Sequence, residues 1–236
     1  TALVVSYAVS RIMKIDHDIA TLVGVGSSIC GGSAIAAAAP VIKASDEDIA
    51  QSISVIFLFN VIAAFLFPTL GAILGFNDMG FGMWAGTAIN DTSSVVAAGQ
   101  TWASASGSDT ALNYATIVKL TRTLAIIPIC LGLAYLTSKR KATTSEVKIS
   151  SIFPMFIIYF LGASIINTFA GSHFDFFQFL PAIGKFMIAM AMAAIGLNTN
   201  LVKLIKTGGK PILLGLICWF CIAVVSLAMQ HLLNIW

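Results

Sequence analysis

Apolar runs long enough to cross a lipid bilayer recur along this sequence, and they constrain its fold more than any other feature. A transmembrane helix needs about 20 consecutive apolar residues, and residues 49–74 and 211–234 are clear examples. The remaining runs are 1–13, 19–42, 81–99, 109–137, 151–170 and about 182–205. The sequence therefore predicts an all-α membrane protein, a polytopic helical bundle.

Composition supports this class. Only 10% of the 236 residues are charged, whereas soluble domains carry about a quarter. This excludes an ordinary soluble enzyme, a nucleic-acid binder and a disordered chain. No long linker divides the sequence, so we expect one transmembrane domain over residues 1–236. Residues 1–13 resemble the interior of a helix and lack an initiating Met, so we expect further spans to precede them.

The basic residues predict how the chain is oriented. Loop 138–150 holds four basic residues and a single acidic one, so the positive-inside rule makes it cytoplasmic. Counting spans back from this loop also places Arg11 and Lys14 on the cytoplasmic side. The same count, with 19–42 crossing once, places the acidic segment 46–48 outside.

Two predicted spans are interrupted by small and polar residues, 24–33 and 196–200. Unwound backbone at mid-membrane depth must be buried in protein or line a wet cavity, and paired interruptions indicate an inverted-repeat transporter. Close packing of small residues is the alternative. Half-helices that begin near Ser33 and near Asn198 or Asn200 would direct N–H groups at an anion. The predicted anion-binding residues here are Ser28, Gly31, Gly32, Ser33, Asn198, Thr199 and Asn200.

Two basic residues, Lys119 and Arg122, lie near the middle of the 109–137 span. A cation at this depth costs roughly 2.5–3.5 kcal/mol, so both are expected to face the bundle interior. Contact with substrate and a structural ion pair with Asp91 remain open as interpretations. Pro128 cannot donate to the carbonyl of Leu124, so we also expect a kink in this helix.

The 81–99 span carries a polar block at 90–94 that includes Asp91, the one acidic residue expected deep in the bilayer. An intramembrane carboxylate typically binds a proton or cation, or neutralises a neighbouring cation. We therefore expect Asn90, Asp91 and Thr92 to couple Na⁺ or H⁺, or to act as charge partners of the two basic residues. No resident metal site is expected.

Three ordered motifs, at 29–42, 82–89 and 115–122, resemble the YeiH-type family of bacterial inner-membrane proteins named as sulfate exporters. The resemblance implies secondary transport of sulfate or a related sulfur oxyanion across the bacterial inner membrane. It also implies a fold similar to bile-acid symporters and sodium–proton antiporters, with inverted repeats and two discontinuous helices that cross. Asn90 stands where the family usually has His, which argues against a proton role for that side chain.

These features combine into a hypothesis of a secondary active transporter of a small anion that works by alternating access. A sodium- or proton-coupled transporter of an organic anion remains an alternative, as does an ion channel or intramembrane sensor. The sequence has no Walker A, GxSxG or HExxH motif, so no ATP-driven pump or enzyme is expected. We expect no cofactor and no nucleic-acid partner. The expected partners are the anion, the lipid bilayer, a coupling Na⁺ or H⁺, and a second copy in a homodimer.

Overall fold

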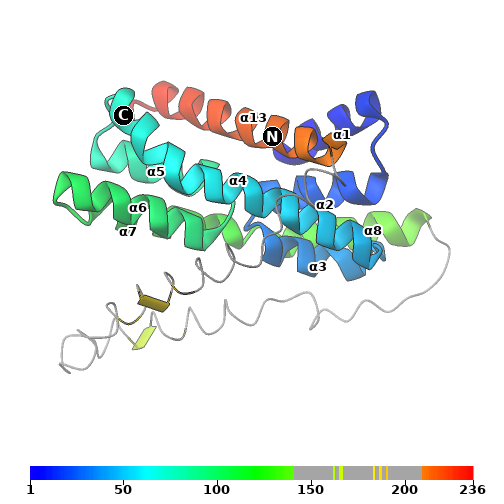
Figure 1. The fold of residues 1–236 in the computed structure, drawn as a ribbon. Helices are drawn as coiled ribbons and strands as arrows, with labels where there is room; N and C mark the ends of the chain where they lie inside the picture. The colour runs from blue at the N-terminus through cyan, green and yellow to red at the C-terminus, as the bar shows by residue number, and fades with distance from the viewer. Residues whose placement is uncertain are drawn as a thin grey trace.

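The computed structural model describes residues 1–140 and 209–235, together with seven positions between 162 and 190. Every regular element within 1–140 and 209–235 is a helix (Figure 1). Three segments are long and apolar enough to cross a membrane: Asp46–Ile73, Thr110–Leu133 and Gly209–Leu232. The predicted all-helical class with membrane-spanning helices is confirmed for this part of the chain.

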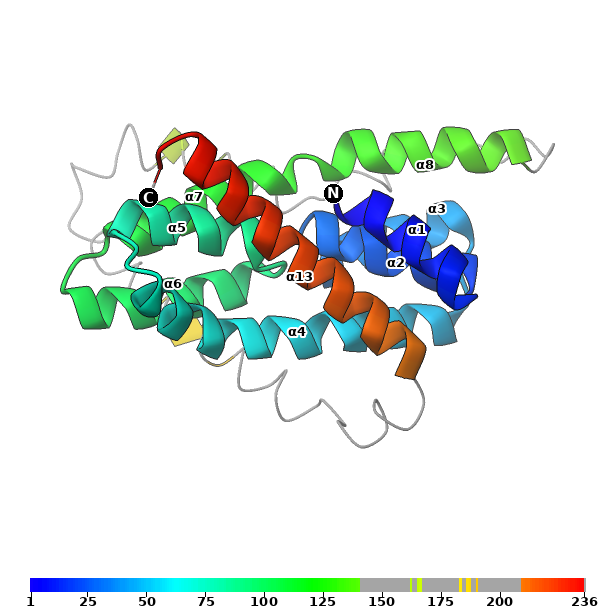
Figure 2. The same ribbon diagram turned by 90° about the horizontal axis from the view of Figure 1, so that it is seen from above.

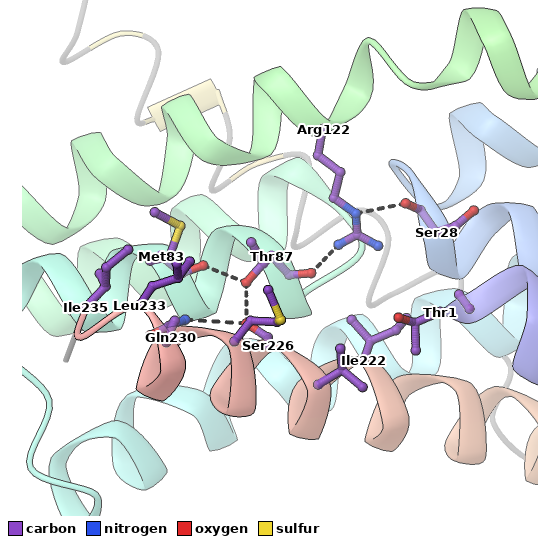
Figure 3. Close-up of a pocket in the computed structure, with 13 residues that line it drawn as sticks. Thr1, Ser28, Met83, Thr87, Arg122, Ile222, Ser226, Gln230, Leu233 and Ile235 are labelled. Atoms are coloured by element: carbon purple, nitrogen blue, oxygen red, sulfur yellow. Dashed lines mark hydrogen bonds between the residues drawn. The ribbon is translucent and has the colours of Figure 1, made fainter.

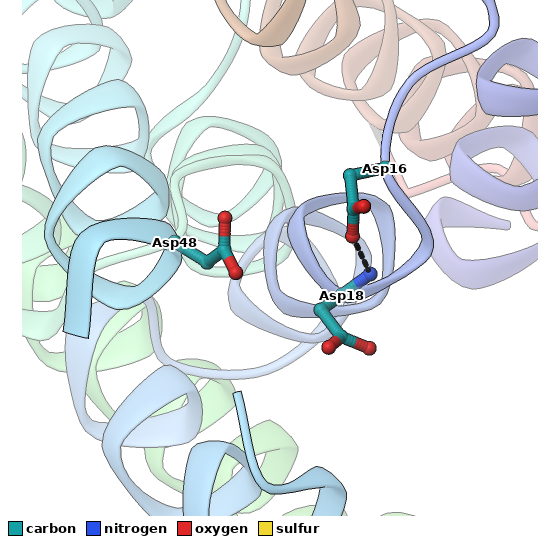
Figure 4. Close-up of side chains that lie close together, drawn as sticks. All are labelled: Asp16, Asp18 and Asp48. Atoms are coloured by element: carbon teal, nitrogen blue, oxygen red, sulfur yellow. Dashed lines mark hydrogen bonds between the residues drawn. The ribbon is translucent and has the colours of Figure 1, made fainter. Parts of the chain in front are cut away.

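Helices α2 and α3 form a hairpin that begins and ends at the same end of the molecule. The first four helices are α1 (Ala2–Met13), α2 (His17–Ser28), α3 (Gly32–Ile42) and α4 (Asp46–Ile73). Asp16 and Asp18 stand at the start of α2, and Asp48 lies in the first turn of α4, shortly after α3 ends. Carboxylate oxygens of these three residues lie within 4.8 Å of one another (Figure 4). The chain therefore returns to the point from which α2 started.

The arms of this hairpin are too short to cross a bilayer. A helix rises 1.5 Å per residue, so the 12 residues of α2 and the 11 of α3 extend roughly 16–18 Å each, against a hydrocarbon core of about 30 Å. The prediction that 19–42 crosses once is therefore wrong. The placement of 46–48 on the opposite side from Arg11 and Lys14 is wrong for the same reason, because a turn at 29–31 reverses the chain.

A second hairpin replaces the continuous span predicted at 81–99. Its arms are α5 (Asp78–Ala88) and α6 (Thr92–Ser106). The start of α5 meets the end of α6, since Trp102 Nε1 donates to Asp78 Oδ1 at 2.8 Å. The rings of Phe81 and Trp102 also stack, with centroids 4.2 Å apart. The polar block at 90–94 lies at the tip of this hairpin and does not sit in the middle of one helix.

The predicted kink before Pro128 is confirmed. The span is divided into α7 (Thr110–Thr123) and α8 (Ile126–Arg140), with the helix interrupted at 124–125. Helix α7 packs closely on the second hairpin because glycines on α5 face it. A Cβ on Gly86 would stand 2.7 Å from the carbonyl oxygen of Ala115, and one on Gly82 would stand 2.8 Å from that of Ala111.

Helix α13 (Gly209–Leu232) runs diagonally across α4, α2 and α5 (Figure 2). Gly215 permits close contact with α4, because a Cβ there would overlap with Val55 Cγ1. Trp84 Nε1 donates to the Ala223 carbonyl at 3.3 Å. Aromatic rings fill the space between α4, α5 and α13: Phe59, Phe67, Phe76, Trp84 and Trp219.

The two hairpins approach each other from opposite ends of the molecule, and their tips meet near its middle (Figure 1 and Figure 2). Helix α4 runs alongside both hairpins, and α7 brings its last turn to the meeting point. We call the tips, at 29–31 and 89–91, together with the side chains that contact them, the hairpin junction.

Candidate functional site

The first tip is a tight turn made possible by glycine. Helix α2 ends at Ser28, and α3 begins after Gly31, whose φ of 73° lies in the left-handed region that favours glycine. The N–H of Gly31 closes the turn on the carbonyl of Gly26 at 3.0 Å. The interruption is thus confined to 29–31, and it is narrower than the stretch 24–33 predicted from the sequence.

Helix α3 begins near Ser33, as predicted, but Ser33 does not cap it. Gly31 occupies the N-cap position and makes no side-chain cap. Ser33 lies within the first turn, where its hydroxyl contacts Cys30 Sγ at 2.9 Å. The N-terminus of α3 therefore keeps backbone N–H groups without a side-chain acceptor from the cap residue.

The second tip is capped by Asp91. Its Oδ2 accepts hydrogen bonds from the backbone N–H of Ser94 at 3.1 Å and from the Ser93 and Ser94 hydroxyls. A carboxylate in this position satisfies an unpaired donor of the first turn and interacts favourably with the helix dipole. Asp91 thus fixes the start of α6.

Lys119 connects the two tips. Its Nζ donates to the carbonyl oxygen of Ile29 at 2.7 Å and to that of Ile89 at 3.0 Å. Both carbonyls belong to C-cap residues, where a helix leaves acceptors without intrahelical partners. The side chain is fully buried, at 0% exposure. A single ammonium therefore holds the C-terminal ends of α2 and α5 together.

Arg122 repeats this arrangement one turn later. Its Nε donates to the Ser28 carbonyl at 2.8 Å, and its terminal nitrogens donate to the carbonyls of Ser27 and Thr87. One of them also lies 3.4 Å from Asn90 Oδ1. Cations at helix C-termini are favoured by the helix dipole, so Lys119 and Arg122 stabilise both interrupted helices.

The ion pair between Asp91 and these cations, one of the two interpretations left open by the sequence, is not formed among the described residues. The cations donate to backbone carbonyls, and Asp91 accepts from its own helix. Asp91 nevertheless lies close enough to Lys119 to interact with it electrostatically. The polar residues found in the sequence thus meet at the junction, but through backbone groups.

Asn60, on the long helix α4, belongs to the junction and was missed in the sequence analysis. Its Oδ1 accepts from the backbone N–H of Asn90 at 3.2 Å. Asn60 and Asn90 are 2% and 0% exposed, and the Nδ2 of each has no partner among the described residues. A lone amide within the apolar middle of 46–73 is the signal that could have revealed it.

A cavity of about 410 Å³ opens beside the junction, between α5, α7 and α13 (Figure 3). Arg122 and Ser28 line it at the junction. Thr87, on α5, faces Ser226 on α13. Ser226 and Gln230, on α13, continue its polar side. Neither residue of α13 was predicted as a site residue, because one serine and one glutamine in an apolar span carry no distinctive pattern.

The structure brings together five of the predicted site residues: Ser28, Gly31, Asn90, Lys119 and Arg122. Asp91 and Thr92 stand at the start of α6 next to them. Gly32 packs toward Phe57, and Ser33 is exposed. Asn198, Thr199 and Asn200 lie outside the described residues, as does the second predicted interruption at 196–200.

Comparison with known proteins places the chain in a family. The family described as Conserved hypothetical protein 698 matches residues 1–215. A UPF0324 membrane protein of Streptococcus pyogenes serotype M3 is 57% identical over 242 residues, which cover all of this chain and 71% of that protein.

Two further relatives have the same description. A UPF0324 membrane protein of Streptococcus mutans serotype c is 57% identical and covered to 71%, and one of Fusobacterium nucleatum is 53% identical and covered to 72%; each alignment includes the whole of this chain. No solved structure matches the chain. The chain belongs to the UPF0324 family of membrane proteins.

Proposed function

We propose that this protein is a secondary active transporter of a small anion, of the class of sulfate and related sulfur oxyanions, that works by alternating access. The observation that carries the proposal is Arg122. Its guanidinium lies at the hairpin junction and lines the cavity, and no carboxylate among the described residues pairs with it. The protein thus bears a cationic group beside an accessible space in its membrane-embedded part.

The charge balance at the junction favours an anion. Each helix C-terminus contributes about half a negative charge and each N-terminus about half a positive charge. The two C-termini and two N-termini at the junction therefore cancel approximately. Lys119 and Arg122 then outweigh Asp91, which leaves about one positive charge. Spare donors remain as well, because an ammonium has three N–H groups and Lys119 uses two for Ile29 and Ile89.

The arrangement of the hairpins suits alternating access. Each hairpin is followed by a long helical segment, and the two units enter from opposite ends of the molecule. This order supports an inverted repeat, in which one unit rocks against the other around a central site. It differs from the repeat expected from 24–33 and 196–200, because both interruptions lie within the first 106 residues.

The resemblance to the YeiH-type family supports a sulfur oxyanion as substrate and the bacterial inner membrane as location. Helices α1, α3 and α8 end at the same end of the molecule (Figure 1 and Figure 2). Lys14, Lys43 and Arg140 follow or complete these helices. By the positive-inside rule, this end faces the cytoplasm.

Counterflow in proteoliposomes that contain the full-length protein tests the proposal. Unlabelled sulfate, sulfite or a sulfonate inside should drive uphill uptake of the labelled compound. Arg122→Gln should abolish this uptake, whereas Arg11→Gln, which removes an exposed arginine on α1, should leave it unchanged. Equal uptake by Arg122→Gln, or uptake without uphill accumulation, would refute the proposal; the second result would indicate a channel.

Coupling to Na⁺ or H⁺ through Asp91 is a second element of the proposal. The observation that favours it is the position of this half-buried carboxylate at the second tip, within electrostatic reach of Lys119. Transport should then depend on a sodium or proton gradient. Counterflow that is insensitive to both gradients would leave Asp91 with a structural role only.

A further inference from the structure

The cavity beside Arg122 is much larger than an inorganic oxyanion requires. Its volume of about 410 Å³ falls within the range of roughly 300–1,000 Å³ that holds organic ligands. A tetrahedral oxyanion with one central atom would contact a small part of this space. The substrate is therefore better judged from the walls of the cavity than from the charge alone.

The polar wall of the cavity already satisfies most of its own hydrogen bonds. Thr87 Oγ1 donates to the Met83 carbonyl at 2.7 Å, and it lies 2.5 Å from Ser226 Oγ. The side-chain amide of Gln230 lies 3.4 Å from the same Ser226 oxygen (Figure 3). This amide also donates to the Gly80 carbonyl at 3.2 Å and accepts from the Trp84 backbone N–H at 3.0 Å. These groups are committed to one another, so they offer few hydrogen bonds to a ligand.

Arg122 is thus the main polar anchor. A guanidinium has five N–H donors, and the contacts to Ser27, Ser28, Thr87 and Asn90 leave one for a ligand. A divalent inorganic anion would lose most of its hydration in exchange for very few new hydrogen bonds. A desolvated polar group without partners is costly, so this wall disfavours sulfate.

Apart from Thr1, at the start of α1, the rest of the cavity lining is apolar. Its residues are Ala2 on α1 and Met83 on α5, together with Ile222, Val225, Met229, Leu233 and Ile235 on or after α13. Apolar side chains of this kind stabilise a bound ligand when they remove its apolar surface from water. Methionine in addition adapts to ligands of different shape.

We infer that the substrate is a monovalent oxyanion with an apolar body, an alkyl- or arylsulfonate, whose head contacts Arg122 and whose body lies between Met83 and α13. This inference rests on the proposed transport function and narrows its substrate class. It favours the organic members of that class over inorganic sulfate.

A competition series tests the inference. Proteoliposomes that contain the full-length protein are loaded with unlabelled methanesulfonate, and counterflow uptake of labelled methanesulfonate from outside is measured while unlabelled sulfate, methane-, butane- or hexanesulfonate competes outside. Competition should strengthen about fourfold for each methylene that enters the cavity. Hexyltrimethylammonium, with the same chain and the opposite charge, should not compete. Stronger competition by sulfate than by hexanesulfonate, or no dependence on chain length, would overturn the inference.

A matched pair of variants tests whether the apolar body of the substrate binds in this cavity. Met83→Trp fills the cavity and should remove the competitive advantage of hexanesulfonate over methanesulfonate. Met79→Trp, one turn earlier on α5 and outside the cavity, should retain the advantage. Identical chain-length dependence in both variants would show that the apolar body binds elsewhere.

A binding measurement separates this inference from the transport function. Hexanesulfonate should raise the unfolding temperature of the purified protein, and Met83→Trp should abolish the shift. Such a shift without any counterflow would refute transport and support the ligand class. Counterflow of sulfate with no shift by hexanesulfonate would support transport and refute the ligand class.

Discussion

The ammonium of Lys119 donates a 2.7 Å hydrogen bond to the carbonyl oxygen of Ile29, 90 residues earlier in the chain. This contact joins α7 to the C-cap of α2, and the second bond of Lys119, to Ile89, adds the C-cap of α5. One buried side chain thereby ties the two hairpin tips together. Its loss should be felt in both hairpins at once.

Lys119→Met should lower the unfolding temperature of the purified protein and abolish counterflow, although the chain still inserts into the membrane. The substitution removes the ammonium that donates hydrogen bonds to two buried carbonyl oxygens. Each buried oxygen left without a donor lowers the free energy of unfolding by about 1–3 kcal/mol. Lys14→Met, at an exposed lysine after α1, is the control and should resemble the parent protein. Equal unfolding temperatures for both variants would contradict the bridging role of Lys119.

Gly31→Ala should destabilise the protein more than Gly75→Ala does. Both glycines have a positive φ, 73° and 71°, and a side chain in that conformation costs roughly 1–2 kcal/mol. A Cβ on Gly31 would also stand 3.3 Å from Ile56 Cγ2 and 3.4 Å from Asn60 Nδ2, whereas one on Gly75 would meet nothing within 4 Å. Thermal unfolding of the two variants checks the difference, and equal losses would mean that packing at the tip is not critical.

Gly86→Ala should separate α5 from α7. The new Cβ would approach the backbone oxygen of Ala115 to 2.7 Å, so the helices must move apart and lose buried contact. Gly132→Ala on α8 meets nothing within 4 Å and should stabilise its helix by up to about 1 kcal/mol. Denaturation in detergent should shift in opposite directions for the two variants. A neutral Gly86→Ala would argue against close packing of α5 on α7.

Asp91→Asn and Asp91→Ala should separate capping from ion coupling. Asparagine is as good an N-cap as aspartate, whereas alanine costs about 0.5–2 kcal/mol, so Asp91→Ala alone should unfold at lower temperature. Neither variant retains a titratable carboxylate, so both should lose any dependence of transport on a sodium or proton gradient. Retained gradient dependence in Asp91→Asn would assign Asp91 a capping role only.

Cysteine labelling should confirm that the first hairpin returns to its starting side. Lys14→Cys and Ser45→Cys flank it, and both should react with an impermeant maleimide from one side of the membrane. Ser106→Cys, at the far end of α6, should react from the other side. The parent protein controls for background labelling of its own cysteines, of which Cys30, Cys130 and Cys218 are buried and Cys221 is half-buried. Labelling of Lys14→Cys and Ser45→Cys from opposite sides would restore a single crossing by 19–42.

Much of the junction could be predicted because it depends on residues that are unusual in an apolar chain. Two cations and one carboxylate at mid-span depth are costly unless they have partners inside the protein. Lys119, Arg122 and Asp91 were therefore identified from type and position alone. Asn60 was missed because one amide in a long apolar run is a weak signal, and its partner Asn90 lies 30 residues away.

The sequence by itself determined the class of the protein, the polar residues of its interior and the kink before Pro128, because each follows from the local chemistry of residues in an apolar setting. Only the tertiary structure decided that 17–42 and 78–106 are hairpins and not crossings. The hydropathy of a segment depends only on its residues, so it is the same whether the chain continues in one direction after a short interruption or reverses there. The direction is set by contacts between distant segments, such as Trp102 with Asp78 and Lys119 with both tips.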